Sequence, residues 1–244
     1  MDIVIPAKLP EHAVDLVVPA TLQSPSVEDR IRSRLTVSAP FVARLTRDQV
    51  TNAGGFPTPP PGDATPCDYF VLAFFCGYRP PPEGMSEPFV DSRIGVRLGC
   101  TDGEPHPIAL SLSPPTSAAP VPPNFRFTVS VPLVVVEPAV EYAPAADRQE
   151  QYIVAIGRGQ SDPEWHLKAV RNQPLVGDVQ FTLLVQSPPT RLVTAEIIVA
   201  ATVRRRGILR RGRADLPSLL HRIDLRGAAE PAVLAAPVEE LPPG

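Results

Sequence analysis

The sequence has few of the residues that most often build catalytic, redox or metal sites. Its 244 residues include three cysteines and four histidines, and none of these lie at the spacing of a zinc or transition-metal site. It also lacks a Gly-x-Ser-x-Gly elbow, a P-loop and a complete dinucleotide-binding fingerprint. We therefore predict no catalytic residue, no metal site and no cofactor, and we expect that the protein is not an enzyme.

Long apolar runs are absent as well. A membrane helix needs roughly 18 to 20 consecutive apolar residues, and the run at residues 131–136 is far shorter. The first residues lack the basic flank and apolar stretch of a secretory signal, and an odd number of cysteines does not complete a disulfide framework. These features predict a soluble protein in a reducing, cytoplasmic setting, with no membrane span.

Proline is what the chain has in excess, with 33 among 244 positions. Because proline has a fixed φ and no amide hydrogen, a run such as residues 56–62 cannot lie inside a helix or a central strand. The segments between such runs are short, β-branched and alternate apolar with polar positions. The sequence therefore predicts an all-β fold: an antiparallel β-sandwich with proline-rich loops, either one large sandwich or two smaller ones.

Four segments carry the pattern that supports this prediction. Residues 124–131 alternate strictly, as in a sheet with one face in water, and residues 191–203 place their odd-numbered apolar side chains on one face. Residues 69–76 are apolar throughout, which predicts a central strand buried on both faces or at a subunit contact. Residues 26–35 show both helical and strand-like spacing, and we interpret them as a helical turn that leads into a strand.

A proline and alanine loop at residues 114–123 is the candidate boundary between two halves. Beyond the last strand, a short helix is expected to begin near Asp215 and to end at Gly227. The predicted organisation has four parts: an N-terminal β-rich region (1–113), a C-terminal β-sandwich region (124–203), an arginine-rich arm with the short helix (204–227) and a disordered tail (228–244).

The arginine-rich arm is the strongest candidate site. Eight arginines and two aspartates give residues 204–226 a charge of +6 in a chain of net charge −3, so the remainder carries −9. Guanidinium groups bind carboxylates and phosphates through paired hydrogen bonds. The alternative interpretation is that the arginines only protect an edge strand and solvate the tail. The predicted partner-binding residues are Arg204, Arg205, Arg206, Arg210, Arg211, Arg213, Leu219, Leu220 and Ile223.

Three further features have a functional and a structural interpretation. Residues 157–162 are similar to a phosphate-binding loop, but they lack its third glycine and a following helix pattern, which favours a β-turn. Trp165, the only tryptophan, is more typical of a core residue than of a ligand platform. The proline runs are either polyproline II ligands for aromatic grooves or stiff loops, and we favour stiff loops.

These observations favour a non-enzymatic structural or binding subunit that assembles through protein–protein contacts. Its arginine-rich arm would engage an acidic partner surface or a neighbouring subunit in an oligomer. An alternative is a nucleic-acid packaging or coat protein whose arm binds phosphates, although the arm has no aromatic residue for base stacking. A third hypothesis is a hydrolase on the β-scaffold, which requires a nucleophile and an acid to converge on His106 or His166.

Overall fold

The computed structural model describes residues 2–3, 5–6, 9–18, 29–52, 66–81, 88–100, 106–116, 129–130, 151–169, 174–189, 192–205 and 208–231. The proline run at residues 56–62, most of the boundary loop and residues 232–244 of the tail lie outside this part of the chain. Of the alternating segment at residues 124–131, only 129–130 are described. The expectations for these segments therefore stay predictions.

Strands make up most of the described residues. The first half of the chain contains β1 (Asp2–Ile3), β2 (Glu11–Val18), β3 (Asp29–Ser38), β4 (Phe41–Leu45), α1 (Arg47–Asn52), β5 (Asp68–Tyr78), β6 (Phe89–Cys100) and β7 (Ile108–Ser113). The second half contains β8 (Val129–Ser130), β9 (Gln151–Ile156), β10 (Glu164–Ala169), β11 (Gly177–Ser187), β12 (Val193–Arg205), β13 (Ile208–Ala214), α2 (Ser218–His221), β14 (Arg222–Asp224) and β15 (Glu230–Pro231).

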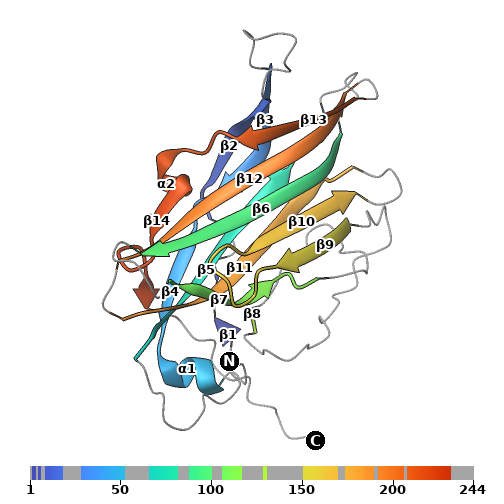
Figure 1. Ribbon diagram of the computed structural model, residues 1–244. Coiled ribbons are helices and arrows are strands. Elements are labelled where there is room, and N and C mark those ends of the chain that lie inside the picture. Colours follow the sequence, from blue (N-terminus) through green and yellow to red (C-terminus); the bar gives the residue numbers. More distant parts are fainter. Residues whose placement is uncertain are drawn as a thin grey trace, which may run out of the picture.

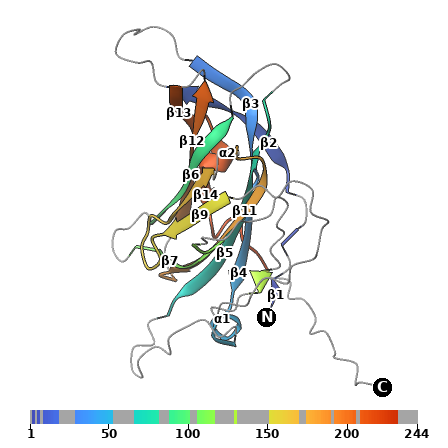
Figure 2. The ribbon, with the colours of Figure 1, turned by 90° about the vertical axis from the view of Figure 1, so that its right-hand side faces the viewer.

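One large sheet holds 13 of these strands, and all its pairs are antiparallel except the short pair of β15 with β4. From edge to edge the order is β7, β11, β5, β3 with β4, β2, β13, β12, β6, β10 and β9. Figures 1 and 2 show that this sheet curves back, so that its two halves face each other across the core. The prediction of an antiparallel all-β fold is confirmed. The sandwich is not, because the pairing of β2 with β13 joins both halves into one nearly closed, barrel-like sheet.

The two edges of the sheet approach each other where β9 and the turn after it meet β7 and the residues that follow β7. The N–H of Ala109 donates to the carbonyl of Gln160 at 2.9 Å, and the N–H of Gly159 donates to the carbonyl of Ala109 at 2.7 Å. Farther along, the Thr116 hydroxyl donates to the Ala155 carbonyl and accepts from its N–H, at 3.1 and 3.0 Å. These bonds occupy backbone groups that would otherwise lie unpaired at an edge.

The core fills the space between the two halves of the sheet. In β12 the odd-numbered side chains from Val193 to Val203 are all buried, as the alternation predicted. Trp165 is fully buried against Phe74 and Phe181, and its indole N–H donates to the Pro114 carbonyl at 3.0 Å. The prediction that this tryptophan is a core residue is therefore confirmed.

Strand β5 is buried along nearly its whole length on both faces, as its apolar sequence predicted. One face belongs to the main core. On the other face Tyr69 and Val71 pack with Leu45, Leu184 and, from α1, Val50. This second cluster explains why the first part of β5 has no polar face: the short helix α1 packs against that face at Tyr69 and Val71.

Two expectations about chain organisation differ from the structure. Residues 29–38 form β3, where we interpreted residues 26–35 as a helical turn; β3 pairs with β2 and β5 and buries Leu35 and Val37, so tertiary pairing outweighs the local helical spacing. Strands from before and after residues 114–123 also pair directly, β12 with β6 and β11 with β5 and β7. The two halves therefore share one sheet and one core.

The predicted arm is also built into the sheet. Residues 208–214 form β13, which pairs with β12 on one side and with β2 on the other. The helix α2 spans only Ser218–His221, with Pro217 at its N-cap, and Arg222 already begins β14. The helix ends early because Ile223 pairs with Ala195 of β12 and is buried there. The segment is thus part of the fold and not an appendage.

Candidate functional site

The predicted partner-binding residues separate into exposed and buried positions. Arg204 at the end of β12 and Arg211 and Arg213 on β13 are exposed. Leu220 and Ile223 are 1% and 5% exposed and belong to the chain's own core, which corrects the expectation that a partner would contact them. Arg206 lies outside the described residues, as do the side chains of the remaining three, Arg205, Arg210 and Leu219.

The exposed arginines share the outer face of the sheet with two arginines of β6. The strand register places Arg93 beside Ala200 and Arg97 beside Glu196 across the β6–β12 pair, and Arg213 beside Ala200 across the β12–β13 pair. We call the outward-facing side chains of β6, β12 and β13 the arginine face; its members are Arg93, Arg97, Arg204, Arg211 and Arg213.

Sequence reasoning missed the two arginines of β6. Arg93 and Arg97 lie far upstream of residues 204–226, and only the strand pairing brings them beside that segment. The available signal was the alternation of β6, in which Ile94, Val96 and Leu98 are buried and the arginines between them point outward. Such alternation is typical of a strand but does not identify the neighbouring strand.

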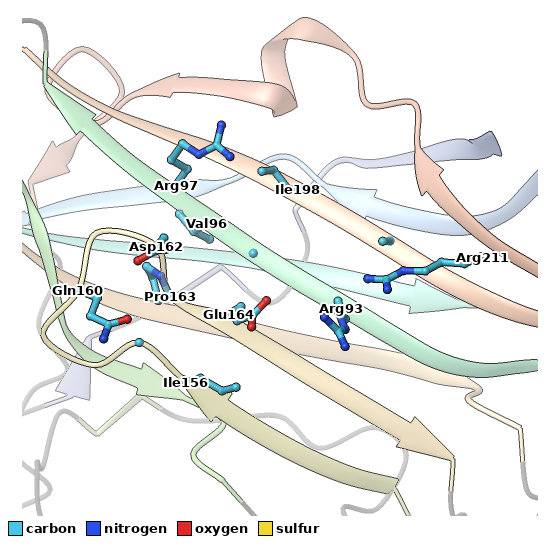
Figure 3. A pocket seen from close by; sticks show the side chains of 13 residues that line it. Arg93, Val96, Arg97, Ile156, Gln160, Asp162, Pro163, Glu164, Ile198 and Arg211 are labelled. Carbon is cyan, nitrogen blue, oxygen red and sulfur yellow. The ribbon is translucent and has the colours of Figure 1, made fainter. Parts of the chain in front are cut away.

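A shallow hollow of about 360 Å³ lies within the arginine face and extends over the turn after β9 (Figure 3). Two of the residues that line it, Gly95 and Ala200, have small side chains or none, which leaves space above the sheet. Figure 3 shows the Arg211 side chain reaching from β13 toward Arg93 at one end of the hollow, with Asp162 at the opposite end. The residues that line it are Arg93, Gly95, Val96, Arg97, Ile156, Gly157, Gln160, Asp162, Pro163, Glu164, Ile198, Ala200 and Arg211.

The charges on this face are only partly balanced. Glu196 lies 3.4 Å from Arg97, 3.9 Å from Arg213 and 2.9 Å from His221. Within the described ranges, neither Arg93 nor Arg211 forms an ion pair or a side-chain hydrogen bond. One end of the hollow therefore holds two exposed guanidinium groups without a carboxylate partner among the described residues.

Another arginine of the predicted arm is structural. The Arg226 guanidinium contacts the carboxylate of Asp68 and the carbonyls of Pro188, at 3.1 Å, and Pro189. Asp68 is buried at the start of β5 and also accepts a hydrogen bond from Arg44 at 2.7 Å. This cluster fastens the segment after β14 to the ends of β5 and β11, so Arg226 does not belong to the arginine face.

The glycine-rich segment at residues 157–162 is a β-turn, as preferred from the sequence. Gln160 donates its N–H to the Gly157 carbonyl at 3.0 Å, and the N–H of Gly159 is bonded to Ala109. Two amides that a phosphate would need are therefore occupied. Gly157 has φ +91°, and a Cβ there would lie 2.7 Å from the Cα of Pro163, so only glycine fits.

Two histidines of the described residues contact carboxylates, and His12 is exposed. His166 lies 2.8 Å from Glu164 and His221 lies 2.9 Å from Glu196, while His106 is exposed. Burial raises the pKa of the Cys76 thiol far above its ordinary value, so this thiol stays protonated at neutral pH. Within the same ranges, no group of three or more histidine, cysteine or acidic side chains is arranged to hold a metal ion.

Comparison with known proteins adds no family assignment: no family model matches the sequence, and a search of curated proteins returns no match. In the part of the chain that the structure describes, neither helix is long and apolar enough to cross a membrane.

Proposed function

We propose that the protein is a non-enzymatic structural or binding subunit that assembles through protein–protein contacts. Its arginine face would engage an acidic surface of a partner or of a neighbouring subunit. The observation that carries the proposal is the gathering of exposed guanidinium groups on three adjacent strands, two of them, Arg93 and Arg211, without an ion pair among the described residues.

A rigid β-sheet surface suits this role. The arginines project from paired strands whose opposite faces are fixed in the core, so their Cα positions are set before a partner arrives. Such preorganisation reduces the entropy lost on binding. The bidentate geometry of arginine then matches a carboxylate.

The charge distribution of the chain supports self-association as one form of the contact. Residues 204–226 carry +6 while the remainder carries −9, so one copy can present its basic segment to the acidic body of another. Contacts of this kind accelerate association and fix orientation more than they add affinity.

Light scattering on wild type and on the triple variant Arg204→Ser, Arg211→Ser, Arg213→Ser tests the proposal. The matched control is Arg47→Ser on α1, which lies at the other end of the molecule from β13 (Figure 1). We expect the wild type and the control to have a native mass above the 26.2 kDa of one chain, or to bind a labelled peptide that alternates glutamate with leucine. The triple variant should lose this association while circular dichroism shows an unchanged fold.

Two results would count against the proposal. The first is that the triple variant has the same mass and binds the peptide as well as wild type does. The second is tight binding of duplex DNA with an affinity that falls log-linearly with salt, which favours the nucleic-acid alternative. The carboxylates of Asp91 on β6, Glu196 on β12 and Glu164 on the adjoining β10 interrupt the basic surface, which makes a phosphate track the weaker interpretation.

A further inference from the structure

We propose that the hollow in the arginine face is a binding site for a short peptide segment in which an acidic residue is followed by an apolar and then a basic residue. One carboxylate would lie against Arg93 and Arg211, an apolar side chain would follow, and a hydrogen-bond donor would lie at the far end. The inference rests on the proposed function, because it names the part of the partner that the arginine face would recognise.

The first step is the cationic end. Arg211 extends across the sheet toward Arg93 (Figure 3), and both guanidinium groups lack an ion pair within the described residues. Two arginines that converge with their donors free present the geometry that a carboxylate accepts. The neighbouring Arg97 and Arg213 differ, because Glu196 already contacts both.

The second step is the middle of the hollow. Gly95 lies opposite Ile198 across the β6–β12 pair and opposite Glu164 across the β6–β10 pair. The missing side chain of Gly95 leaves room above the sheet, and Ile198, which lines the hollow, supplies an apolar wall on the β12 side of it. On the β10 side, Glu164 lies between Gly95 and Ile156. A side chain of moderate size, such as leucine, would remove this apolar surface from water.

The third step is the far end, where the charge reverses. Asp162 and Gln160 line it, and Figure 3 shows both on the side away from Arg211, with Glu164 between them and the arginines. These groups accept hydrogen bonds and would repel a second anion. A nucleic-acid backbone, with one phosphate after another, is therefore a poor fit, whereas a peptide that changes from acidic to basic along its length is complementary.

The volume agrees with such a ligand. About 360 Å³ is at the lower end of the range for small-ligand sites. The cationic end, the middle and the anionic end of the hollow would each contact one residue of an extended peptide. The expected minimal ligand is an acidic, an apolar and a basic residue in succession.

Titration calorimetry with the peptide acetyl-Glu-Leu-Lys-amide, in both chain orders, tests this site. The matched peptides replace glutamate by glutamine, and the protein variants are Arg93→Gln, Arg211→Gln and the control Arg222→Gln. Arg222 is exposed on β14, outside the arginine face, and it does not line the hollow. Loss of a charge-assisted bond should weaken binding about tenfold or more in the first two variants, and less than about twofold in the control.

Three outcomes would overturn the site. They are equal affinity for the glutamate and glutamine peptides, equal weakening by all three protein variants, and competition by inorganic phosphate with no peptide binding. The last outcome would indicate a small-anion site. If peptide binding depends on Arg93 and Arg211 but the Arg204, Arg211, Arg213 variant assembles normally, the peptide site is supported and the proposed function is wrong. If that variant loses assembly but the peptide does not bind, the peptide site is wrong and the proposed function is supported.

Discussion

Replacing Arg226 by alanine tests whether a buried ion pair fastens the C-terminal part of the chain to the sheet. The Arg226 guanidinium contacts the Asp68 carboxylate, whose side chain is only 10% exposed. In the variant, Arg44 at 2.7 Å would be the carboxylate's ion partner, and the Arg44 side chain is 59% exposed. The Pro188 carbonyl would also lose a donor at 3.1 Å.

The cost follows from the burial of the two partners. Removing one member of a fully buried ion pair typically destabilises a protein by about 3 to 5 kcal/mol, because the other charge is left in a poorly solvated place. Here Arg44 remains, and the Arg226 side chain is 30% exposed, so water already screens part of the interaction. We expect the free energy of unfolding to fall by about 2 to 3 kcal/mol.

Urea unfolding monitored by Trp165 fluorescence measures this change, because the only tryptophan lies fully buried in the core. Hydrogen exchange gives a local readout, since the Leu225 N–H donates to the Val193 carbonyl at 2.9 Å and should exchange faster in the variant. Arg222→Ala, at an exposed position on β14, is the control and should stay within about 0.5 kcal/mol of wild type. The reasoning is wrong if Arg226→Ala also stays within that range and the Leu225 amide keeps its protection.

Two further predictions concern the turn and the buried ionisable groups. Gly157→Ala should lower the free energy of unfolding by about 2 to 3 kcal/mol, because φ is +91° and the new Cβ would meet Pro163. The control Gly159→Ala has open space for its Cβ and should lower the free energy of unfolding by only about 1 kcal/mol. If thermal unfolding shows that both variants lose the same stability, the predicted clash between the Cβ at residue 157 and Pro163 is wrong. Burial raises the pKa of Cys76 and Tyr78 above their ordinary values of 9.0 and 10.0, so the folded state keeps protons that the unfolded state releases. Each group should therefore lower the free energy of unfolding by up to about 1.4 kcal/mol per pH unit, above about pH 9 for Cys76 and above about pH 10 for Tyr78. The variants Cys76→Ala and Tyr78→Phe should each make the free energy of unfolding less dependent on pH. If the free energy of unfolding does not change with pH above about pH 9, this explanation is wrong.

The fold class was predictable because it depends on local patterns. Alternation in β12 and continuous apolar sequence in β5 report directly on burial, and both strands have the predicted faces. What the patterns could not supply was pairing. The single sheet depends on β2 meeting β13, a contact between the two ends of the chain that no local signal specifies. The interpretation of residues 26–35 as a helical turn was wrong for the same reason, because β3 takes its conformation from its neighbours.

The candidate site was predictable only in part. The concentration of arginine in residues 204–226 indicated Arg211 and Arg213, which the structure places at exposed positions. Charge counting could not distinguish these from Arg226, whose role depends on Asp68 more than 150 positions away. It also could not find Arg93, because that residue joins the group only through the β6–β12–β13 register.

A charge-reversal binding experiment tests the central claim that the arginine face recognises acidic protein surface. Fluorescence anisotropy would compare wild type with the Arg93→Glu, Arg211→Glu variant, using one labelled peptide that alternates glutamate with leucine and a second that alternates lysine with leucine. The account predicts that wild type prefers the glutamate peptide and that the variant prefers the lysine peptide, with both preferences weakening as salt rises. An unchanged preference in the variant would contradict it.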